Sequence, residues 1–240
     1  PDLGALRPER FLSVAERSGL ITDIGDWVLL RACHEAAGWA RPWPIAVNLS
    51  ARQLVHPGLV DACTAALELS GLAPARLVLA AAEDALAAAG AAAATAGAAL
   101  DRVFTRLRAL GVRLALDDFG RGHSAFAWLE RFGFDDLKLD PSFVRSPEDD
   151  VRAAIVAETA ARLGDSLGMA VCAEGVETRT QLERIRRIGC TRAQGFFFDH
   201  PLSCERLRVR LAETDDRPLH RAATRRREPA LWLPGVGLEV

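Results

Sequence analysis

Short runs of aliphatic and β-branched residues alternate along the chain with longer segments whose apolar residues recur every three to four positions. Most of the short runs are apolar throughout, which is typical of strands that are covered on both faces. The alternation predicts repeated βα units and a mainly parallel sheet. The expected strands are residues 45–50, 77–82, 112–119, 135–140, 169–175 and 193–198.

Four of the longer segments predict amphipathic helices. The first covers 8–18 and has a proline near its N-terminus, Asp23 is expected to cap the second, and the third covers 150–163. Thr178 is expected to cap the fourth, which ends before Gly189. The residues expected to face the core are Phe11, Val14 and Ala15 in the first helix, Ile24, Trp27 and Val28 in the second, Val151, Ile155 and Leu163 in the third, and Leu182, Ile185 and Ile188 in the fourth.

Two stretches depart from this alternation. Residues 80–100 are largely alanine with interspersed glycines, and we expect a helix with an inserted loop near 84–99. From residue 205 we expect a final helix, so that residues 1–210 form one domain and 211–240 form a basic, proline-containing tail or linker. The arginine run at 225–227 has no aromatic residues interleaved with it, so no nucleic-acid partner is expected.

Composition narrows the class of protein without identifying it. The formal net charge of −2 produces no whole-chain field that would attract nucleic acid or an anionic membrane. No apolar run approaches the roughly 20 residues that a membrane-spanning helix needs. The five cysteines are odd in number and scattered, which argues against a disulfide framework and indicates a reducing, cytoplasmic location. Because the first residue is Pro1, we expect the chain to begin inside a longer reading frame.

Polar and acidic residues follow one expected strand after another, at the ends where the loops of βα barrels carry chemistry. Asp117 and Asp118 directly follow an apolar run, where paired charges are costly unless they meet solvent, a cation or a metal. Taken singly, such a pair is more often a solvated turn, and a strand-end glutamate is more often structural. Taken together, these oxygen donors favour a phosphate site or a site for Mg²⁺, Mn²⁺ or Ca²⁺. The polar residues at or just after the ends of the first five expected strands are Asn48, Ser50, Glu83, Asp117, Asp118, Lys138, Asp140, Glu174 and Glu177, and Gln194 lies at the start of the sixth.

Five short motifs at these strand ends resemble, in order and nearly throughout in spacing, those of EAL-domain cyclic-di-GMP phosphodiesterases. The resemblance covers roughly residues 1–205, and a segment from Arg7 to Ile21 resembles the helix that precedes the motifs in that family. The motifs are Asn48-Leu49-Ser50, Asp117-Asp118-Phe119-Gly120-Arg121-Gly122-His123-Ser124, Leu137-Lys138-Leu139-Asp140, Ala173-Glu174-Gly175-Val176-Glu177 and Gln194-Gly195-Phe196.

The resemblance implies a TIM-like (β/α)8 barrel that hydrolyses cyclic di-GMP to pGpG with Mg²⁺ or Mn²⁺. It also implies a homodimer formed through the Asp-Asp-Phe-Gly loop region, and a parent protein with an upstream diguanylate-cyclase-like, sensory or membrane-anchoring segment. The implied roles are metal binding for Asn48, Asp117 and Asp118, catalysis for Lys138, Glu174 and Gln194, loop stabilisation for Glu83, and substrate binding for Asp140, Ser124, Gly195 and Pro201.

Three departures from the family pattern bear on activity. The Glu-Ala-Leu signature and the first two strands of the barrel are absent, and we expect a truncated sequence rather than a natural loss. The first glutamate of the family's Glu-x-x-Glu, a metal ligand, is Ala80 here, whereas the second is Glu83. The loop threonine is Arg121, which would either compete with a metal or contact a ligand's phosphate. An insertion of several residues also follows Glu83.

These departures leave two classes of function open at this point. The first is a working phosphodiesterase. The second is a catalytically impaired domain that binds cyclic di-GMP as a receptor, or that serves as a protein-interaction scaffold. Ala80 favours impairment, whereas the retained acidic residues and Lys138 favour catalysis. Another metal-dependent barrel enzyme, such as an aldolase, would not explain the ordered motifs.

Overall fold

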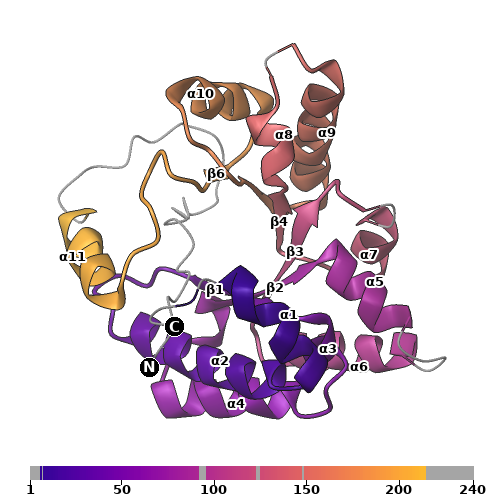
Figure 1. Ribbon diagram of the computed structural model, residues 1–240, viewed down its shortest axis with the longest axis vertical. Coiled ribbons are helices and arrows are strands. Elements are labelled where there is room, and N and C mark those ends of the chain that lie inside the picture. The colour runs from indigo at the N-terminus through magenta and orange to yellow at the C-terminus, as the bar shows by residue number, and fades with distance from the viewer. Residues whose placement is uncertain (1–5, 7, 92–95, 123–124, 148, 215–240) are drawn as a thin grey trace.

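The computed structural model describes residues 6, 8–91, 96–122, 125–147 and 149–214 (Figure 1). Six parallel strands form one sheet in chain order, and each strand pairs with the strands before and after it. The sheet is an open part of a barrel, because no described residues link β1 to β6. The strands are β1 (Ile45–Leu49), β2 (Leu77–Ala82), β3 (Arg113–Phe119), β4 (Asp136–Leu139), β5 (Ala170–Ala173) and β6 (Arg192–Ala193).

Helices connect these strands and cover the outer face of the sheet (Figure 1). None of the described helices is both long and apolar enough to cross a bilayer. The helices are α1 (Pro8–Ser18), α2 (Ile21–Ala37), α3 (Ala51–Leu54), α4 (Leu59–Ser70), the 3₁₀ turn η1 (Pro74–Arg76), α5 (Glu83–Ala91), α6 (Ala96–Ala109), α7 (Ala125–Arg131), α8 (Pro141–Arg145), α9 (Val151–Leu167), α10 (Arg179–Ile188) and α11 (Cys204–Thr214).

All six strands lie where the apolar runs predict them, and only β6 differs appreciably in extent. The expected strand 193–198 ends after Ala193, because the chain next bends around the end of β5. There Val176 donates to the Gln194 carbonyl oxygen, and the Phe197 N–H donates to the Val176 carbonyl oxygen. A Cβ on Gly195 would lie 2.2 Å from that carbonyl oxygen of Val176, so the close approach requires glycine.

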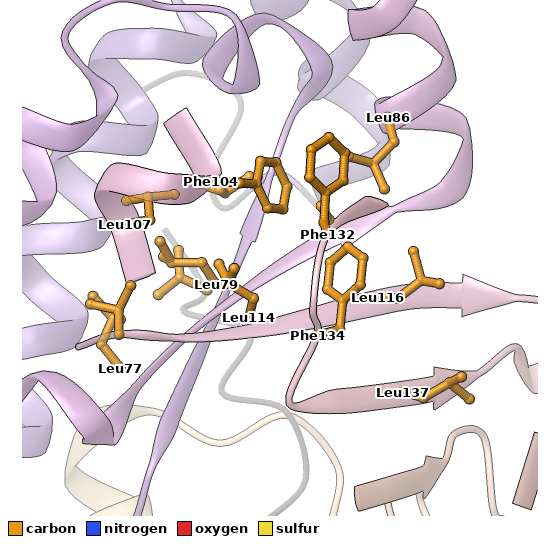
Figure 2. Close-up of a cluster of buried hydrophobic side chains, with 14 of the residues drawn as sticks. Leu77, Leu79, Leu86, Phe104, Leu107, Leu114, Leu116, Phe132, Phe134 and Leu137 are labelled. Atoms are coloured by element: carbon orange, nitrogen blue, oxygen red, sulfur yellow. The ribbon is translucent and has the colours of Figure 1, made fainter. Parts of the chain in front are cut away.

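The two faces of the sheet are packed differently. On the outer face, leucines of β2, β3 and β4 pack against aromatic residues of the helical layer (Figure 2). Phe104 stacks on Phe132 there with ring centroids 4.2 Å apart. On the inner face, Val78, Ala80 and Ala115 form a separate, small buried cluster. Since alternate strand residues face opposite sides, Ala80 points into the barrel interior.

The predicted helices exist, but several predicted buried faces are wrong. Asp23 does not cap α2, because that helix begins two residues earlier, at Ile21. The residues Val14, Trp27, Val151 and Ile155, all expected in the core, are exposed. Helix α9 packs instead through alanines and Gly164, where an added Cβ would lie 2.1 Å from Val171. The helix therefore lies too close to β5 for large side chains at the contact.

The predicted cap and end of α10 are confirmed. Thr178 caps α10 in a reciprocal capping box with Gln181, and Gly189 ends the helix in the left-handed conformation. In the alanine-rich stretch, the helical part is α5 and the start of α6, while residues 92–95 of the expected loop lie outside the described residues.

The predicted final helix is α11, which packs far from β6, against the end of α2 and the residues before β1 (Figure 1). Leu207 and Leu211 pack with Trp43 in a small apolar cluster. Arg208 donates to both carboxylate oxygens of the buried Glu35 on α2, at 2.7 and 2.6 Å. The expected domain boundary at residue 210 falls inside α11, and the tail 215–240 lies outside the described residues.

Candidate active site

Three carboxylates gather at the carboxyl ends of β3 and β5. Asp117, Asp118 and Glu174 each place one oxygen within 4.8 Å of the others. Consecutive residues of a regular strand point to opposite faces, but the register between β3 and β4 shifts between Leu116 and Phe119. Asp118 also has φ +54°, and it is the one non-glycine residue with positive φ in the described part of the chain. This local irregularity brings two adjacent aspartates to the same site.

Lys138 on β4 lies between two of these carboxylates. Its ammonium group is 2.6 Å from Asp117 Oδ2 and 2.7 Å from Glu174 Oε1, and its side chain is 5% exposed. Burial lowers the pKa of Lys138, but the two carboxylates outweigh burial and the net effect raises that pKa. Burial raises the pKa of Glu174 to about 7, Lys138 opposes this rise and Asp117 adds to it. The lysine is therefore held as a cation between two acids.

Lys138 is the only lysine in the sequence, and the other 29 basic residues are arginines. An ammonium group is a compact point charge, whereas a guanidinium group is planar and larger. The space between Asp117 and Glu174, with N–O distances of 2.6 and 2.7 Å on opposite sides, suits the smaller cation. The geometry thus accounts for lysine at this one position.

The loop after β3 rests on Glu83, a buried residue at the start of α5. Glu83 Oε1 accepts a hydrogen bond of 2.8 Å from the Gly120 N–H. Burial raises the pKa of Glu83, and hydrogen bonds from the loop backbone oppose the rise. A Cβ on Gly122 would lie 2.3 Å from Glu83 Oε2, so the loop approaches this carboxylate closely at two glycines.

Gly120 should be among the least replaceable residues of this loop. It has φ +98°, and an added Cβ would lie 2.6 Å from the Phe143 ring on α8. We expect Gly120→Ala to lower the free energy of unfolding by roughly 2–4 kcal/mol through backbone strain and overpacking. Gly71→Ala is a matched control, because Gly71 has φ +70° with no atom within 4 Å of the added Cβ. If urea unfolding gives equal losses of unfolding free energy for the two variants, the contact with Phe143 has no effect on stability.

Asp140 and Arg121 extend the charged site toward α8. Asp140 caps α8 by accepting a hydrogen bond of 2.7 Å from the Ser142 N–H. Arg121 Nε lies 3.6 Å from the other Asp140 oxygen, and the arginine side chain is 59% exposed. The pKa of Asp118 is raised by burial and by the charges of Asp117 and Asp140, and Arg121 partly opposes this effect.

Helix α8 is anchored at its other end by Arg184 of α10. The Arg184 guanidinium donates to the carbonyl oxygens of Phe143, Val144, Ser146 and Pro147. Phe143 and Val144 lie in the last turn of α8, where a helix leaves carbonyl groups without intrahelical partners, and Ser146 and Pro147 directly follow the helix. No sequence signal singles out Arg184 among the arginines of α10, so this support for the site was missed by sequence analysis.

The remaining predicted site residues have less direct connections to the acidic cluster. Asn48 is exposed near the end of β1, in register with Ala80 on β2. Gln194 directly follows β6, and its buried Oε1 has no hydrogen-bond partner among the described residues. Gly195 lies against Val176, and Pro201 is exposed between β6 and α11. Ser124 lies outside the described residues.

The acidic cluster fits a hard divalent cation, because its donors are all carboxylate oxygens and three of them converge. Ala80 adds no donor. Ala80 is 1% exposed and packs with Val78 and Ala115 in the barrel interior. It lies two residues before Ala82, which is the β2 residue in register with Asp117 on β3. The cluster is therefore centred on β3 and β5 rather than on β2.

Parallel βα units with carboxylates and a buried lysine at the strand ends define an α/β-barrel type of domain. The region at the strand ends that holds Asp117, Asp118, Asp140 and Glu174 is called the acidic mouth below. The family model for the EAL domain matches residues 1–201, and the chain belongs to this family. The fold expected from the sequence, a TIM-like barrel of the EAL type represented by six strands, is thereby confirmed.

Individual relatives agree with this assignment. The chain is 42% identical over 207 residues to an uncharacterized signaling protein of Caulobacter vibrioides, covering 86% of this chain and 25% of that protein. It is 38% identical over 216 residues to the bifunctional diguanylate cyclase/cyclic di-GMP phosphodiesterase MucR of Pseudomonas aeruginosa, covering 88% of this chain and 30% of that protein. The chain thus spans less than a third of the length of these relatives. A structure of the MucR phosphodiesterase in complex with c-di-GMP superposes with a TM-score of 0.75 at 39% identity, covering 84% of this chain and 87% of that one.

Proposed function

We propose that this domain is a phosphodiesterase that hydrolyses cyclic di-GMP to linear pGpG. The observation that carries the proposal is the position of Lys138, held between Asp117 and Glu174 with Asp118 alongside. This arrangement offers a fixed cation, a carboxylate with a raised pKa and oxygen donors within one small volume. Membership of the EAL family, and similarity to the domain of MucR that was solved with c-di-GMP, support the choice of substrate.

Asp117 and Asp118, with Asn48 from β1, are the proposed ligands of Mg²⁺ or Mn²⁺. When bound, such an ion supplies Lewis-acid activation of water and neutralises charge on the phosphoryl oxygens. Glu83 is proposed to stabilise the loop that carries Asp118, because it accepts a hydrogen bond from Gly120. The positive charges of Arg121 and Lys138 offset part of the repulsion that Asp118 experiences from the neighbouring carboxylates.

The remaining proposed roles concern water and substrate. Glu174 has its pKa raised to about 7, which suits a group that accepts a proton from the attacking water near neutral pH. Lys138 orients that carboxylate and the water, with Gln194 completing the catalytic set. Water adds across one phosphodiester bond, the ribose hydroxyl leaves with a proton, and the ring opens to a linear dinucleotide. The residues proposed to bind substrate are Asp140, Ser124, Gly195 and Pro201.

A second candidate function is a cyclic-di-GMP receptor or protein-interaction scaffold with impaired catalysis. It is favoured by Ala80, whose methyl group is buried in the barrel interior at a position where the EAL pattern has a metal-binding glutamate. Loss of one anionic ligand weakens the binding of a hard cation. The retained Asp117, Asp118, Lys138 and Glu174 make catalysis the better supported of the two functions.

The setting of the domain is also a proposal. We propose that residues 1–210 form the EAL domain, with an alanine-rich insertion near 84–99, and that 211–240 are a linker or tail. We also propose a cytoplasmic location and a homodimer formed through the Asp-Asp-Phe-Gly loop region. A parent protein with an upstream diguanylate-cyclase-like or sensory domain fits the relatives' greater length.

The proposed activity is tested by incubating the protein with cyclic di-GMP and Mg²⁺ or Mn²⁺ and following pGpG by chromatography. We expect turnover in the unchanged protein and a loss of at least about a hundredfold in Asp117→Ala, because that change removes a proposed metal ligand and a partner of Lys138. The exposed ion pair of Asp101 and Arg131 supplies the control, Asp101→Ala, which should leave turnover unchanged.

Ala80→Glu separates the two candidate functions. Turnover that appears only in Ala80→Glu, together with binding of cyclic di-GMP by the unchanged protein, would establish the receptor. Neither binding nor turnover by a folded protein would exclude both the enzyme and the receptor.

A further inference from the structure

Arg121 is the single side chain between two glycines whose positions are set by close contacts. Gly120 lies against the Phe143 ring and Gly122 against Glu83 Oε2, with distances of 2.6 and 2.3 Å to an added Cβ. The Arg121 N–H also donates to the Asp118 carbonyl oxygen at 3.3 Å. The backbone of Arg121 is thus fixed at the acidic mouth, so its side chain leaves a defined point.

Within the described part of the chain, the N–H donors of the Arg121 guanidinium group make no hydrogen bond, and its one ion pair is with Asp140. The Nε atom of Arg121 lies 3.6 Å from Asp140 Oδ2, which exceeds hydrogen-bonding distance. Its side chain is 59% exposed, whereas that of Asp140 is 6% exposed. A guanidinium group has five N–H donors in a planar fork that matches the oxygens of a phosphate. Asp140 therefore orients the arginine without occupying the N–H donors of its guanidinium group.

The net charge of the acidic mouth explains why a cation is needed at position 121. The carboxylates of Asp117, Asp118, Asp140 and Glu174 face Lys138 and Arg121, so the fully ionised group has a net charge of −2. One divalent cation would neutralise it. Without Arg121 the same group and cation would retain a charge of −1, and would repel the anion of a phosphodiester.

We infer that Arg121 is a ligand-binding residue whose guanidinium group binds a non-bridging phosphate oxygen of the cyclic dinucleotide. The inference rests on the proposed substrate and adds a contact in which this chain differs from the family's loop, where the residue is threonine. Arg121 thereby offsets the acidity of the mouth toward an anionic ligand.

The inference is tested by two binding measurements on Arg121→Gln, Arg121→Lys and the unchanged protein. Cyclic di-GMP affinity is measured by calorimetry in EDTA and again in Mg²⁺, and Mn²⁺ affinity is measured from the electron paramagnetic resonance signal of the free ion. Arg162→Gln is the matched control, because Arg162 is a 79% exposed arginine paired with Glu158 on α9. Thermal unfolding confirms that the variants are folded.

We expect Arg121→Gln to weaken cyclic di-GMP binding by about tenfold or more, the usual range for a charge-assisted hydrogen bond. Arg121→Lys should lose less, since it retains the charge but not the fork. Mn²⁺ binding should be unchanged or tighter in Arg121→Gln, because a neighbouring cation has been removed.

A loss of cyclic di-GMP affinity without a loss of Mn²⁺ affinity distinguishes a phosphate contact from simple competition with metal. If Arg121→Gln binds cyclic di-GMP as tightly as the unchanged protein, or binds it and Mn²⁺ both more tightly, the inference is wrong and the proposed function stands. If the unchanged protein binds cyclic di-GMP under neither condition, the proposed function fails, and this inference fails with it.

Discussion

Replacement of Asp136 by alanine should lower the free energy of unfolding by about 3–5 kcal/mol, the usual cost of breaking a buried ion pair from one side. Asp136 begins β4, and its side chain is fully buried. Arg113 at the start of β3 donates to both of its oxygens, at 2.8 and 2.7 Å, and Arg192 at the start of β6 donates to one of them. The variant would remove the buried carboxylate to which the Arg192 guanidinium, which is 8% exposed, donates.

The opposing contributions at Asp136 are visible in its titration. Burial raises the pKa of Asp136, and the charges of Arg192 and Arg113 oppose this rise. Burial likewise lowers the pKa of Arg192. Each group is thus costly to bury alone, so removing one partner should cost more than the pair contributes in net terms.

Urea unfolding at neutral pH measures this effect. Asp101→Ala is the control, because it breaks an ion pair that is half exposed and should change stability far less. Asp136 lies at the N-terminal ends of the strands, away from the acidic mouth, so turnover per folded molecule should be unchanged in Asp136→Ala. A loss of stability below about 1 kcal/mol would show that the two arginines find other partners.

Replacement of Lys138 by methionine should have the largest effect on turnover. Methionine fills a similar elongated volume but removes the cation between Asp117 and Glu174. We expect turnover of cyclic di-GMP to fall by about 10²–10⁴-fold, the range for loss of general-base catalysis, because Lys138 orients Glu174, the proposed base, and the attacking water. Mn²⁺ affinity should rise at the same time, because two carboxylates lose a competing positive charge.

The paired measurements make this prediction specific. Turnover of cyclic di-GMP and binding of Mn²⁺ are measured on Lys138→Met and on Lys138→Arg. The second variant retains the positive charge in a larger, planar group. Lys138→Arg should also lose turnover, since the two N–O distances leave little room. Full activity in Lys138→Arg would show that any cation is sufficient at this position.

The strands and their order were predictable because uninterrupted apolar runs mark strands buried on both faces. The gathering of Asp117, Lys138 and Glu174 was predictable for a related reason, since parallel strands place their carboxyl ends at one edge. In contrast, the sequence did not predict which residues of each helix are buried. Val151 and Ile155 suggested the packed face of α9, yet the contact is made by alanines and Gly164, because the helix lies close to β5.

Other features of the site depend on contacts that a single sequence does not reveal. The positive φ of Asp118 follows from a break in register, and Asp-Asp in a strand gives no local signal for it. The support of α8 by Arg184 joins residues about forty positions apart. The catalytic and binding roles of Asn48, Gln194, Gly195 and Pro201 remain predictions from the family pattern.

The burial of the only lysine side chain gives this protein a built-in chemical reporter. Amine-acylating reagents modify a lysine only when its nitrogen is accessible and uncharged, and the Lys138 ammonium is enclosed by two carboxylates with 5% of the side chain exposed. Acylation of the peptide that contains Lys138 therefore requires the mouth to open. Its rate, followed by mass spectrometry, reports the opening free energy of this one site in the unlabelled protein.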